Sequence, residues 1–237
     1  MQKTYLDCLA ELGVGGAHPG GLKLTKKMLK PEVINESTKV LDAGCGTGQT
    51  AANIVQLYGC TVTALDYNKM MVKKARSRFD ALGLQTDVIH GNTENLPFNN
   101  KVYDIILSES VIAFSDVTKT IHEFSRVLKE TGVLLAIEMV LEKDIPEEEL
   151  SMLSEFYSIS RFRTTGEWMR EFKDAGFNRI EVEKYEPKFD AHDVENAPDF
   201  SLSEEMDDQL FDILEQHEQY MKKYKDTLDF RIFRCSF

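Results

Sequence analysis

Short apolar runs alternate with amphipathic helical patterns over roughly the first 140 residues of the chain. Nearly continuous apolar runs predict strands over 40–43, 60–65, 86–90, 102–108 and 133–139. Apolar side chains at helical spacing predict helices over 50–58, 69–82 and 116–129. Alternation of this kind predicts an α/β fold, in which a parallel sheet carries helices on both faces.

The helix expected over 69–82 has the clearest sequence limits. Asn68 can cap its N-terminus with a side-chain oxygen, and Gly83 can end it in the left-handed conformation. The residues expected on its buried side are Met71, Ala75, Phe79 and Leu82.

The remaining segments depart from simple alternation. A helical pattern also precedes the first strand, through Leu22, Met28 and Leu29. Towards the C-terminus we expect a helix over 165–175, stopped by Gly176, and a strand over 178–185. Ser201 and Glu204 have the spacing of a capping box, which predicts one amphipathic helix through Tyr224. A near-alternating apolar pattern over 228–237 predicts a final strand.

Three glycines follow the first expected strand at every second position, as Gly44, Gly46 and Gly48. Glycine allows positive φ and lets a ligand approach the main chain, and the helix that follows offers unpaired N–H groups. This strand, loop and helix therefore predict a site for a nucleotide-like cofactor.

Asp66 ends the second expected strand, about 20 residues after the glycine loop, which is the spacing of a ribose-binding carboxylate. The glycine pattern is G-x-G-x-G, whereas the dinucleotide fingerprint G-x-G-x-x-G would require a glycine where Gln49 stands. The sequence therefore favours a cofactor other than a dinucleotide.

These features resemble the class I S-adenosylmethionine-dependent methyltransferases, and the resemblance covers most of the chain. It rests on the loop over 40–50, the segment 65–68, the segment 91–98 and the segment 103–109. The best-matched group is the small-molecule enzymes similar to the ubiquinone and menaquinone C-methyltransferases. The resemblance implies a Rossmann-like, seven-stranded and mostly parallel sheet, whose last strand is antiparallel.

The resemblance also implies a set of cofactor contacts. S-adenosylmethionine would bind with its methionine portion along the three glycines and Asp42, its ribose on Asp66, and its adenine near Tyr67 and Met71. Asn92 and Thr93 would meet the adenine edge, although the family usually has Asp where Asn92 stands, and Ser108 completes the set. S-adenosylhomocysteine would be the product, and no metal is implied.

Two residues are candidates for proton transfer at the acceptor. Glu109 directly follows the fourth expected strand, at the edge where parallel sheets present functional groups. His18 lies in a Gly/Pro-rich stretch that could fold over the cofactor as a lid. Either side chain could instead be structural or exposed. The aromatic residues Tyr5, Phe114, Tyr157, Phe162 and Trp168 could wall an acceptor pocket or belong to the core.

Composition narrows the class of partner. The net charge of −12, from 28 basic and 40 acidic residues, disfavours nucleic acid. Charges interrupt every apolar run, so no membrane insertion is expected, and Asp7 and Glu11 argue against a signal peptide. Four scattered cysteines, Cys8, Cys45, Cys60 and Cys235, indicate neither zinc nor disulfides, although a spatial cluster for metalloid chemistry stays open. A cytoplasmic location is the expectation.

We therefore expect one methyltransferase domain over 1–237. It comprises a lead-in and lid over 1–36, a cofactor-binding core over 37–185, and a helical insertion with the final strand over 186–237. The acceptor would be a small molecule that the sequence does not identify, and the oligomeric state is also open. Two other functions remain: a nucleotide-binding oxidoreductase on the same sheet, and a cofactor-binding protein without catalytic activity.

Overall fold

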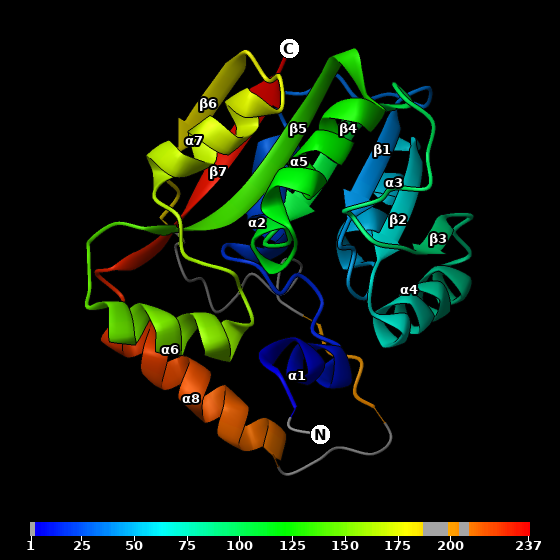
Figure 1. The fold of residues 1–237 in the computed structure, drawn as a ribbon. Helices are drawn as coiled ribbons and strands as arrows, with labels where there is room; N and C mark the ends of the chain where they lie inside the picture. The colour runs from blue at the N-terminus through cyan, green and yellow to red at the C-terminus, as the bar shows by residue number, and fades with distance from the viewer. Residues whose placement is uncertain (1–2, 187–198, 204–208) are drawn as a thin grey trace.

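The computed structural model describes residues 3–186, 199–203 and 209–237, and it contains a seven-stranded sheet (Figure 1). The strands follow the order β3-β2-β1-β4-β5-β7-β6. Their bounds are β1 Lys39–Ala43, β2 Thr61–Asp66, β3 Asp87–His90, β4 Tyr103–Glu109, β5 Leu128–Leu141, β6 Arg179–Glu183 and β7 Leu228–Ser236. Strands β1 to β5 pair in parallel, whereas β7 is antiparallel to both β5 and β6. The expected fold class is confirmed.

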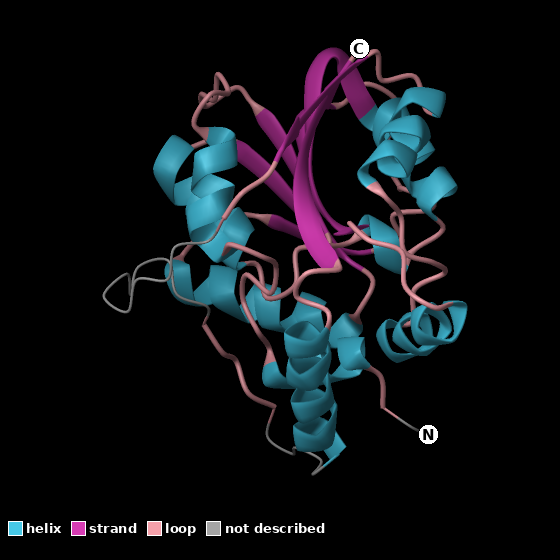
Figure 2. Cartoon of the chain, turned by 90° about the vertical axis from the view of Figure 1, so that its left-hand side faces the viewer, coloured by secondary structure: helices cyan, strands magenta, loops and turns pink. Residues whose placement is uncertain are grey.

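Helices cover both faces of this sheet, and further helices lie at one end of it (Figure 2). Their bounds are α1 Tyr5–Leu12, α2 Gly21–Leu29, α3 Gln49–Tyr58, α4 Lys69–Leu82, the 3₁₀ helix η1 Ile112–Phe114, α5 Val117–Val127, α6 Glu147–Tyr157, α7 Thr165–Asp174 and α8 Gln209–Lys223. One buried cluster contains Phe124, Trp168 and Phe233, and the other contains Leu24 and Ile54. Each face of the sheet therefore has its own apolar layer.

Helix α4 has the predicted limits, because both capping signals operate. The Asn68 side chain accepts hydrogen bonds from the N–H groups of Met70 and Met71. Gly83 ends the helix with φ of 65°. The predicted buried face is correct except at its last position, because Leu82 is 46% exposed.

Several predicted limits were wrong. Helix α5 ends at Val127, and the chain enters β5 at the next residue, so β5 is longer than expected. Helices α1 and α6 were not predicted. Ser201 lies in the described segment 199–203 but outside a helix, since α8 begins only at Gln209. Glu204, its expected capping partner, lies outside the described residues.

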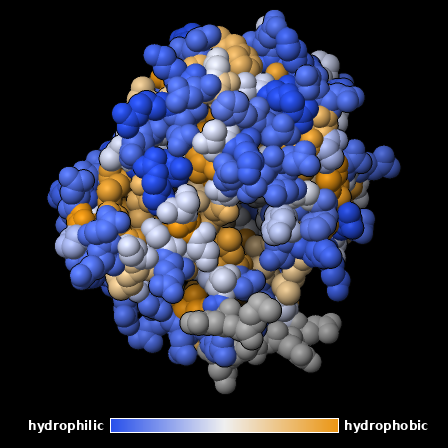
Figure 3. Space-filling model, viewed as in Figure 1, coloured by the Kyte–Doolittle hydropathy of each residue, from blue (hydrophilic) through white to orange (hydrophobic). Residues whose placement is uncertain are grey.

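Helices α1, α6 and α8 form a separate layer at one end of the sheet (Figure 1). Aromatic rings join them: Tyr5 of α1 stacks on His217 of α8 with ring centroids 4.8 Å apart, and it meets Tyr157 of α6 edge-on at 5.2 Å. The hydroxyl of Tyr157 lies 3.0 Å from Nδ1 of His217. Hydrophobic side chains gather between this layer and the sheet, below a mostly polar face (Figure 3). Within the described residues, no helix has the length and hydropathy needed to cross a bilayer.

Candidate cofactor and acceptor site

The glycine loop folds back on the end of β2. The N–H groups of Gly44 and Cys45 both donate to the carbonyl of Leu65, at 2.8 and 3.0 Å. All three glycines have positive φ, with 86° at Gly44, 53° at Gly46 and 77° at Gly48. Positive φ favours glycine at these positions, so the loop geometry accounts for the sequence pattern.

The three glycines differ in what surrounds them. A Cβ on Gly44 would lie 2.3 Å from Cγ2 of Val111, and one on Gly48 would lie 2.8 Å from the Phe79 ring. A Cβ on Gly46 would meet no described heavy atom within 4 Å. Gly44 and Gly48 thus allow close packing within the protein, whereas Gly46 alone presents bare main chain to open space.

Asp66 binds the two loops that flank it. Its Oδ2 accepts a hydrogen bond from the N–H of Gly46 at 2.8 Å, and its Oδ1 accepts one from the N–H of Asn68 at 2.7 Å. Burial raises the pKa of Asp66, and these N–H groups oppose that shift. A carboxylate offers about four lone-pair positions, so both oxygens can still accept from ribose hydroxyls.

Asp42, at the end of β1, is almost fully buried, with 4% of its surface exposed. Burial raises the pKa of Asp42 well above its usual range, and the negative charges of Glu109 and Asp66 add to the shift, whereas the N–H of Ala51 opposes it. Its Oδ2 has no hydrogen-bond partner among the described residues. A buried acceptor without a partner fits a ligand that brings a donor, such as an ammonium group.

The remaining residues predicted to meet the cofactor lie around the same loops. Tyr67 is 74% exposed beside Asp66, and Met71 is buried in the first turn of α4. The side-chain oxygen of Asn92 accepts from the N–H of Glu94 at 2.9 Å and keeps a second lone pair. The Thr93 hydroxyl lies 3.2 Å from that of Thr120, whereas Ser108 is fully buried and its hydroxyl has no described partner.

His18 and Glu109, the two predicted proton-transfer residues, lie together. Nε2 of His18 is 3.3 Å from Oε2 of Glu109, and their side chains are only 4% and 7% exposed. Two hydroxyls also bind the carboxylate: Thr25 of α2 donates to Oε1 at 2.6 Å, and Thr50 of α3 donates to Oε2 at 3.0 Å. The site thus holds a buried carboxylate that three side chains orient.

His18 has polar contacts at both ring nitrogens. Nδ1 lies 3.3 Å from the carbonyl oxygen of Pro19. Nε2 lies 3.3 Å from Oε2 of Glu109 and 3.4 Å from the hydroxyl oxygen of Thr25. The imidazole ring is therefore held between the main chain of its own loop and the Glu109 carboxylate.

The sequence analysis did not identify the residues that secure this end of the molecule. Arg78 of α4 donates to the Thr47 carbonyl at 2.8 Å and forms an ion pair with Asp199 at 2.6 Å. One turn earlier, Nζ of Lys74 donates to the carbonyls of Ala10 and Glu11, at 2.8 and 2.9 Å. Helix α4 thus joins the glycine loop, helix α1 and the segment 199–203. Only the helical spacing of the two cations could have signalled this.

The predicted aromatic wall is largely core. Trp168 is 1% exposed and stacks on Phe172, and its indole N–H donates to the Met139 carbonyl at 3.0 Å. Tyr157 and Phe162 are also buried in that cluster. The four cysteines are buried free thiols, and the described residues contain no group of three His, Cys, Asp or Glu that could hold a metal ion.

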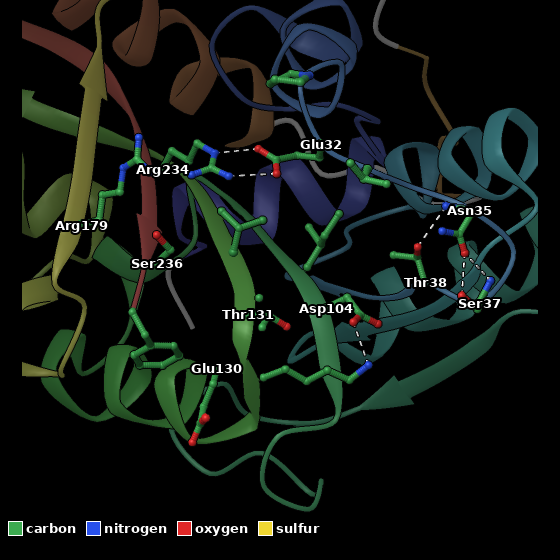
Figure 4. A pocket seen from close by; sticks show the side chains of 17 residues that line it. Glu32, Asn35, Ser37, Thr38, Asp104, Glu130, Thr131, Arg179, Arg234 and Ser236 are labelled. Carbon is green, nitrogen blue, oxygen red and sulfur yellow. Dashed lines mark hydrogen bonds and ion pairs between the residues drawn. The ribbon is translucent and has the colours of Figure 1, made fainter.

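A cavity of about 620 Å³ lies at the opposite edge of the sheet, near the amino ends of the parallel strands (Figure 4). Arg234 lies there with its guanidinium 2.7 Å from Glu32, and Lys129 lies 2.7 Å from Asp104. His18 and Glu109 are not among its lining residues. The cavity is therefore separate from the carboxyl-end site.

The fold and the loop geometry define a Rossmann-like protein, in which the glycine loop, Asp66 and Glu109 lie at the carboxyl ends of β1, β2 and β4. The methyltransferase domain family matches residues 40–132. Over 231 residues the chain is 37% identical to an uncharacterized methyltransferase, YodH, of Bacillus subtilis, with 97% of each chain covered. The chain belongs to the class I S-adenosylmethionine-dependent methyltransferases, and S-adenosylmethionine is its cofactor.

Two further matches are named for different acceptors. The chain is 37% identical over 137 residues to the ubiquinone/menaquinone biosynthesis C-methyltransferase UbiE of Psychromonas ingrahamii. This alignment covers 54% of the present chain and 51% of UbiE. A solved structure of phosphoethanolamine N-methyltransferase 2 from Haemonchus contortus, in complex with S-adenosyl-L-methionine, matches with a TM-score of 0.74 at 19% identity. That match covers 92% of this chain and 53% of the other, and it shows a shared fold.

Proposed function

We propose that this methyltransferase acts on a small molecule whose nucleophilic atom carries a proton, such as a hydroxyl or an ammonium group, and that Glu109 accepts that proton. The observation that carries the proposal is the buried pair of His18 and Glu109, with 3.3 Å between Nε2 and Oε2. An acceptor with a free electron pair needs only alignment, so a buried and oriented carboxylate would have no task there.

The chain's own groups fit the cofactor. The unpartnered Oδ2 of Asp42 suits the amino group of the methionine portion, Asp66 suits the ribose, and the bare main chain of Gly46 leaves room beside them. When bound, S-adenosylmethionine supplies a methyl group that its sulfonium already activates. Three neighbouring carboxylates, Asp42, Asp66 and Glu109, also favour a cation in this site.

In the proposed reaction, bound S-adenosylmethionine would supply the methyl group to the acceptor atom and would leave as S-adenosylhomocysteine. The acceptor's proton passes to a carboxylate oxygen of Glu109. His18, Thr25 and Thr50 keep that carboxylate in place through their contacts with its two oxygens. Alignment of the two substrates supplies most of the acceleration, which can reach about 7 to 11 kcal/mol in favourable cases.

The lead-in over 1–36 is proposed to close over the acceptor, since His18 and Thr25 both belong to it and reach Glu109. The core over 37–185 would hold the cofactor, and the segment over 186–237 would set acceptor specificity with helices α1 and α6. A cytoplasmic location and the absence of nucleic-acid substrates remain predictions from composition.

The test is turnover with radiolabelled S-adenosylmethionine on matched acceptors that differ only at the nucleophilic atom. Hydroxyl and amine acceptors should be labelled, whereas their thioether analogues should not. Preferential labelling of proton-free acceptors would contradict the proposal. Thermal shift provides a separate check on the cofactor: S-adenosylhomocysteine at a hundred times its Kd should stabilise the protein by about 2.7 kcal/mol, and NAD should not. Binding without any turnover in broad metabolite extracts would favour an inactive cofactor-binding protein.

A further inference from the structure

A carboxylate lies buried in the middle of the sheet, outside the site described above. Glu138 of β5 is completely buried. Its Oε1 accepts hydrogen bonds from the N–H groups of Val111 at 3.2 Å and Ile112 at 2.9 Å, and its Oε2 accepts one from Ala113 at 3.3 Å. Three successive main-chain donors thus converge on one side chain.

These donors belong to the turn that directly follows Glu109, over residues 110–114. Ser110 starts it in the left-handed conformation with φ of 60°, which is unfavourable for a residue with a Cβ. The N–H of Ser110 donates to the carbonyl of Ile137, the residue before Glu138, at 2.7 Å. Strand β5 therefore holds this strained turn through its main chain at one residue and its side chain at the next.

The turn touches both ends of the predicted cofactor site. At one end, the Val111 side chain packs directly on the main chain of Gly44. A Cβ added to Gly44 would lie only 2.3 Å from Cγ2 of Val111. At the other end, the Ser115 hydroxyl donates to the carbonyl of Ile112 at 2.8 Å and lies 2.8 Å from the hydroxyl of Thr120. The Thr120 hydroxyl in turn lies 3.2 Å from the hydroxyl of Thr93, which belongs to the loop expected at the adenine.

We propose that Glu138 is a positioning residue for cofactor binding, which fixes the turn over 110–114 so that Val111 supports the glycine loop and Glu109 faces the acceptor. The inference rests on the proposed placement of the cofactor along Gly44, Gly46 and Thr93. Glu138 itself contacts neither substrate, since its carboxylate is enclosed between β5 and the turn.

Few charges face this carboxylate. Burial raises the pKa of Glu138 to about 7, against the three N–H groups and the positive charge of Arg163. Opposite it on β7 stands Arg231, which forms ion pairs with Asp229 and Glu142. Protonation of Glu138 weakens it as a hydrogen-bond acceptor, so the turn is held most firmly where the carboxylate is ionised.

The experiment compares the wild-type enzyme with Glu138→Gln by calorimetry with S-adenosylhomocysteine between pH 6 and pH 8. We expect the variant to bind about tenfold more weakly at pH 8 and nearly as well as wild type at pH 6, because three charge-assisted bonds are lost only where Glu138 is ionised. The control is Asp104→Asn, which alters a carboxylate that accepts from the N–H of Lys39 at 2.9 Å at the far edge of the sheet and should leave affinity unchanged at both pH values.

An affinity ratio between wild type and Glu138→Gln that is the same at both pH values would assign Glu138 a merely structural role and overturn the inference. If Glu138→Gln does not fold, Val111→Ala tests the same turn without altering the carboxylate. It should weaken S-adenosylhomocysteine binding, and wild-type affinity in this variant would also overturn the inference. Failure of wild type itself to bind S-adenosylhomocysteine would instead contradict the placement of the cofactor.

Discussion

His18 Nε2 lies 3.3 Å from Glu109 Oε2, although the two residues come from separate elements of the chain. Glu109 ends a central strand, whereas His18 lies in the loop between α1 and α2. The contact holds the lead-in against the carboxyl edge of the sheet and leaves both side chains almost fully buried. The position of the lead-in and the position of the proposed base are therefore coupled.

Glu109→Gln should lower kcat for a hydroxyl or amine acceptor by about 100- to 10,000-fold, the usual range for a lost general base. The amide keeps the shape of the carboxylate, but it cannot take a proton from the acceptor. S-adenosylhomocysteine affinity should remain similar, since Glu109 is assigned to the acceptor. Steady-state kinetics and calorimetry on the same preparation separate the two effects.

A matched carboxylate variant is Glu130→Gln, which alters an ion pair with Lys101 at the opposite edge of the sheet from His18 and Glu109. Its kcat should match wild type. Wild-type turnover by Glu109→Gln would remove Glu109 from the proton-transfer step, and an equal loss of cofactor affinity would place it at the cofactor instead.

Asp66→Asn should weaken S-adenosylhomocysteine binding by about 1.5 to 3 kcal/mol, the range for hydrogen bonds to a charged group. Asparagine is the better substitution, because Asp66 also accepts from the N–H groups of Gly46 and Asn68, and alanine would leave both loops unsupported. Isothermal titration measures the change. Unchanged affinity, with an unchanged melting temperature, would exclude Asp66 from the ribose site.

The sequence predicted those parts of the fold that local patterns determine. Asn68 and Gly83 set the limits of α4, because a side-chain cap and a left-handed glycine act within a few residues. Alternation predicted the parallel sheet and the position of Glu109 at its edge. Helix α6 was not predicted, although Pro146 with three glutamates after it is a helix-start signal, and Leu150, Leu153 and Tyr157 follow at helical spacing.

Long-range packing determines what the sequence did not predict. The pairing of His18 with Glu109 depends on how the lead-in crosses the sheet, and no local pattern specifies that path. Glu138 had no sequence signal, since its three partners are main-chain N–H groups that any sequence could supply. Arg78 was missed for the same reason, because it binds a main-chain carbonyl at Thr47.

Gly46→Ala and Gly83→Ala form a matched pair that separates backbone strain from loss of the site. Both glycines have positive φ, 53° and 65°, and neither added Cβ would meet a described atom within 4 Å. Each substitution should therefore reduce the free energy of unfolding by a similar amount, about 1 to 2 kcal/mol. Only Gly46→Ala should also weaken S-adenosylhomocysteine binding, because its Cβ enters the space beside Asp66. The loss in affinity should be at least about tenfold, which corresponds to about 1.4 kcal/mol.

Chemical denaturation and calorimetry on both variants test this pair. Equal affinities for S-adenosylhomocysteine in Gly46→Ala and Gly83→Ala would show that the open face of Gly46 does not contact the cofactor.

Asp42→Asn should stabilise the cofactor-free protein at neutral pH and weaken cofactor binding at the same time. The folded-state pKa of Asp42 is raised above its unfolded value, chiefly by burial and then by Glu109 and Asp66. The neutral form therefore contributes stability that is fully present below the unfolded pKa, about 3.9 in model peptides, and is lost as pH rises through the folded pKa. Asparagine imitates the neutral form at every pH.

The difference in melting temperature between Asp42→Asn and wild type should thus be small near pH 4 and should grow as pH rises towards 7. If the melting temperature of wild type instead rose relative to that of the variant with increasing pH, the folded protein would prefer the ionised form of Asp42. Asp104→Asn is the control, because Asp104 pairs with Lys129 at the far edge of the sheet. This variant should have no higher melting temperature than wild type at neutral pH. Weaker S-adenosylhomocysteine binding by the more stable variant would then identify Asp42 as a residue whose buried charge serves the cofactor at the expense of the fold.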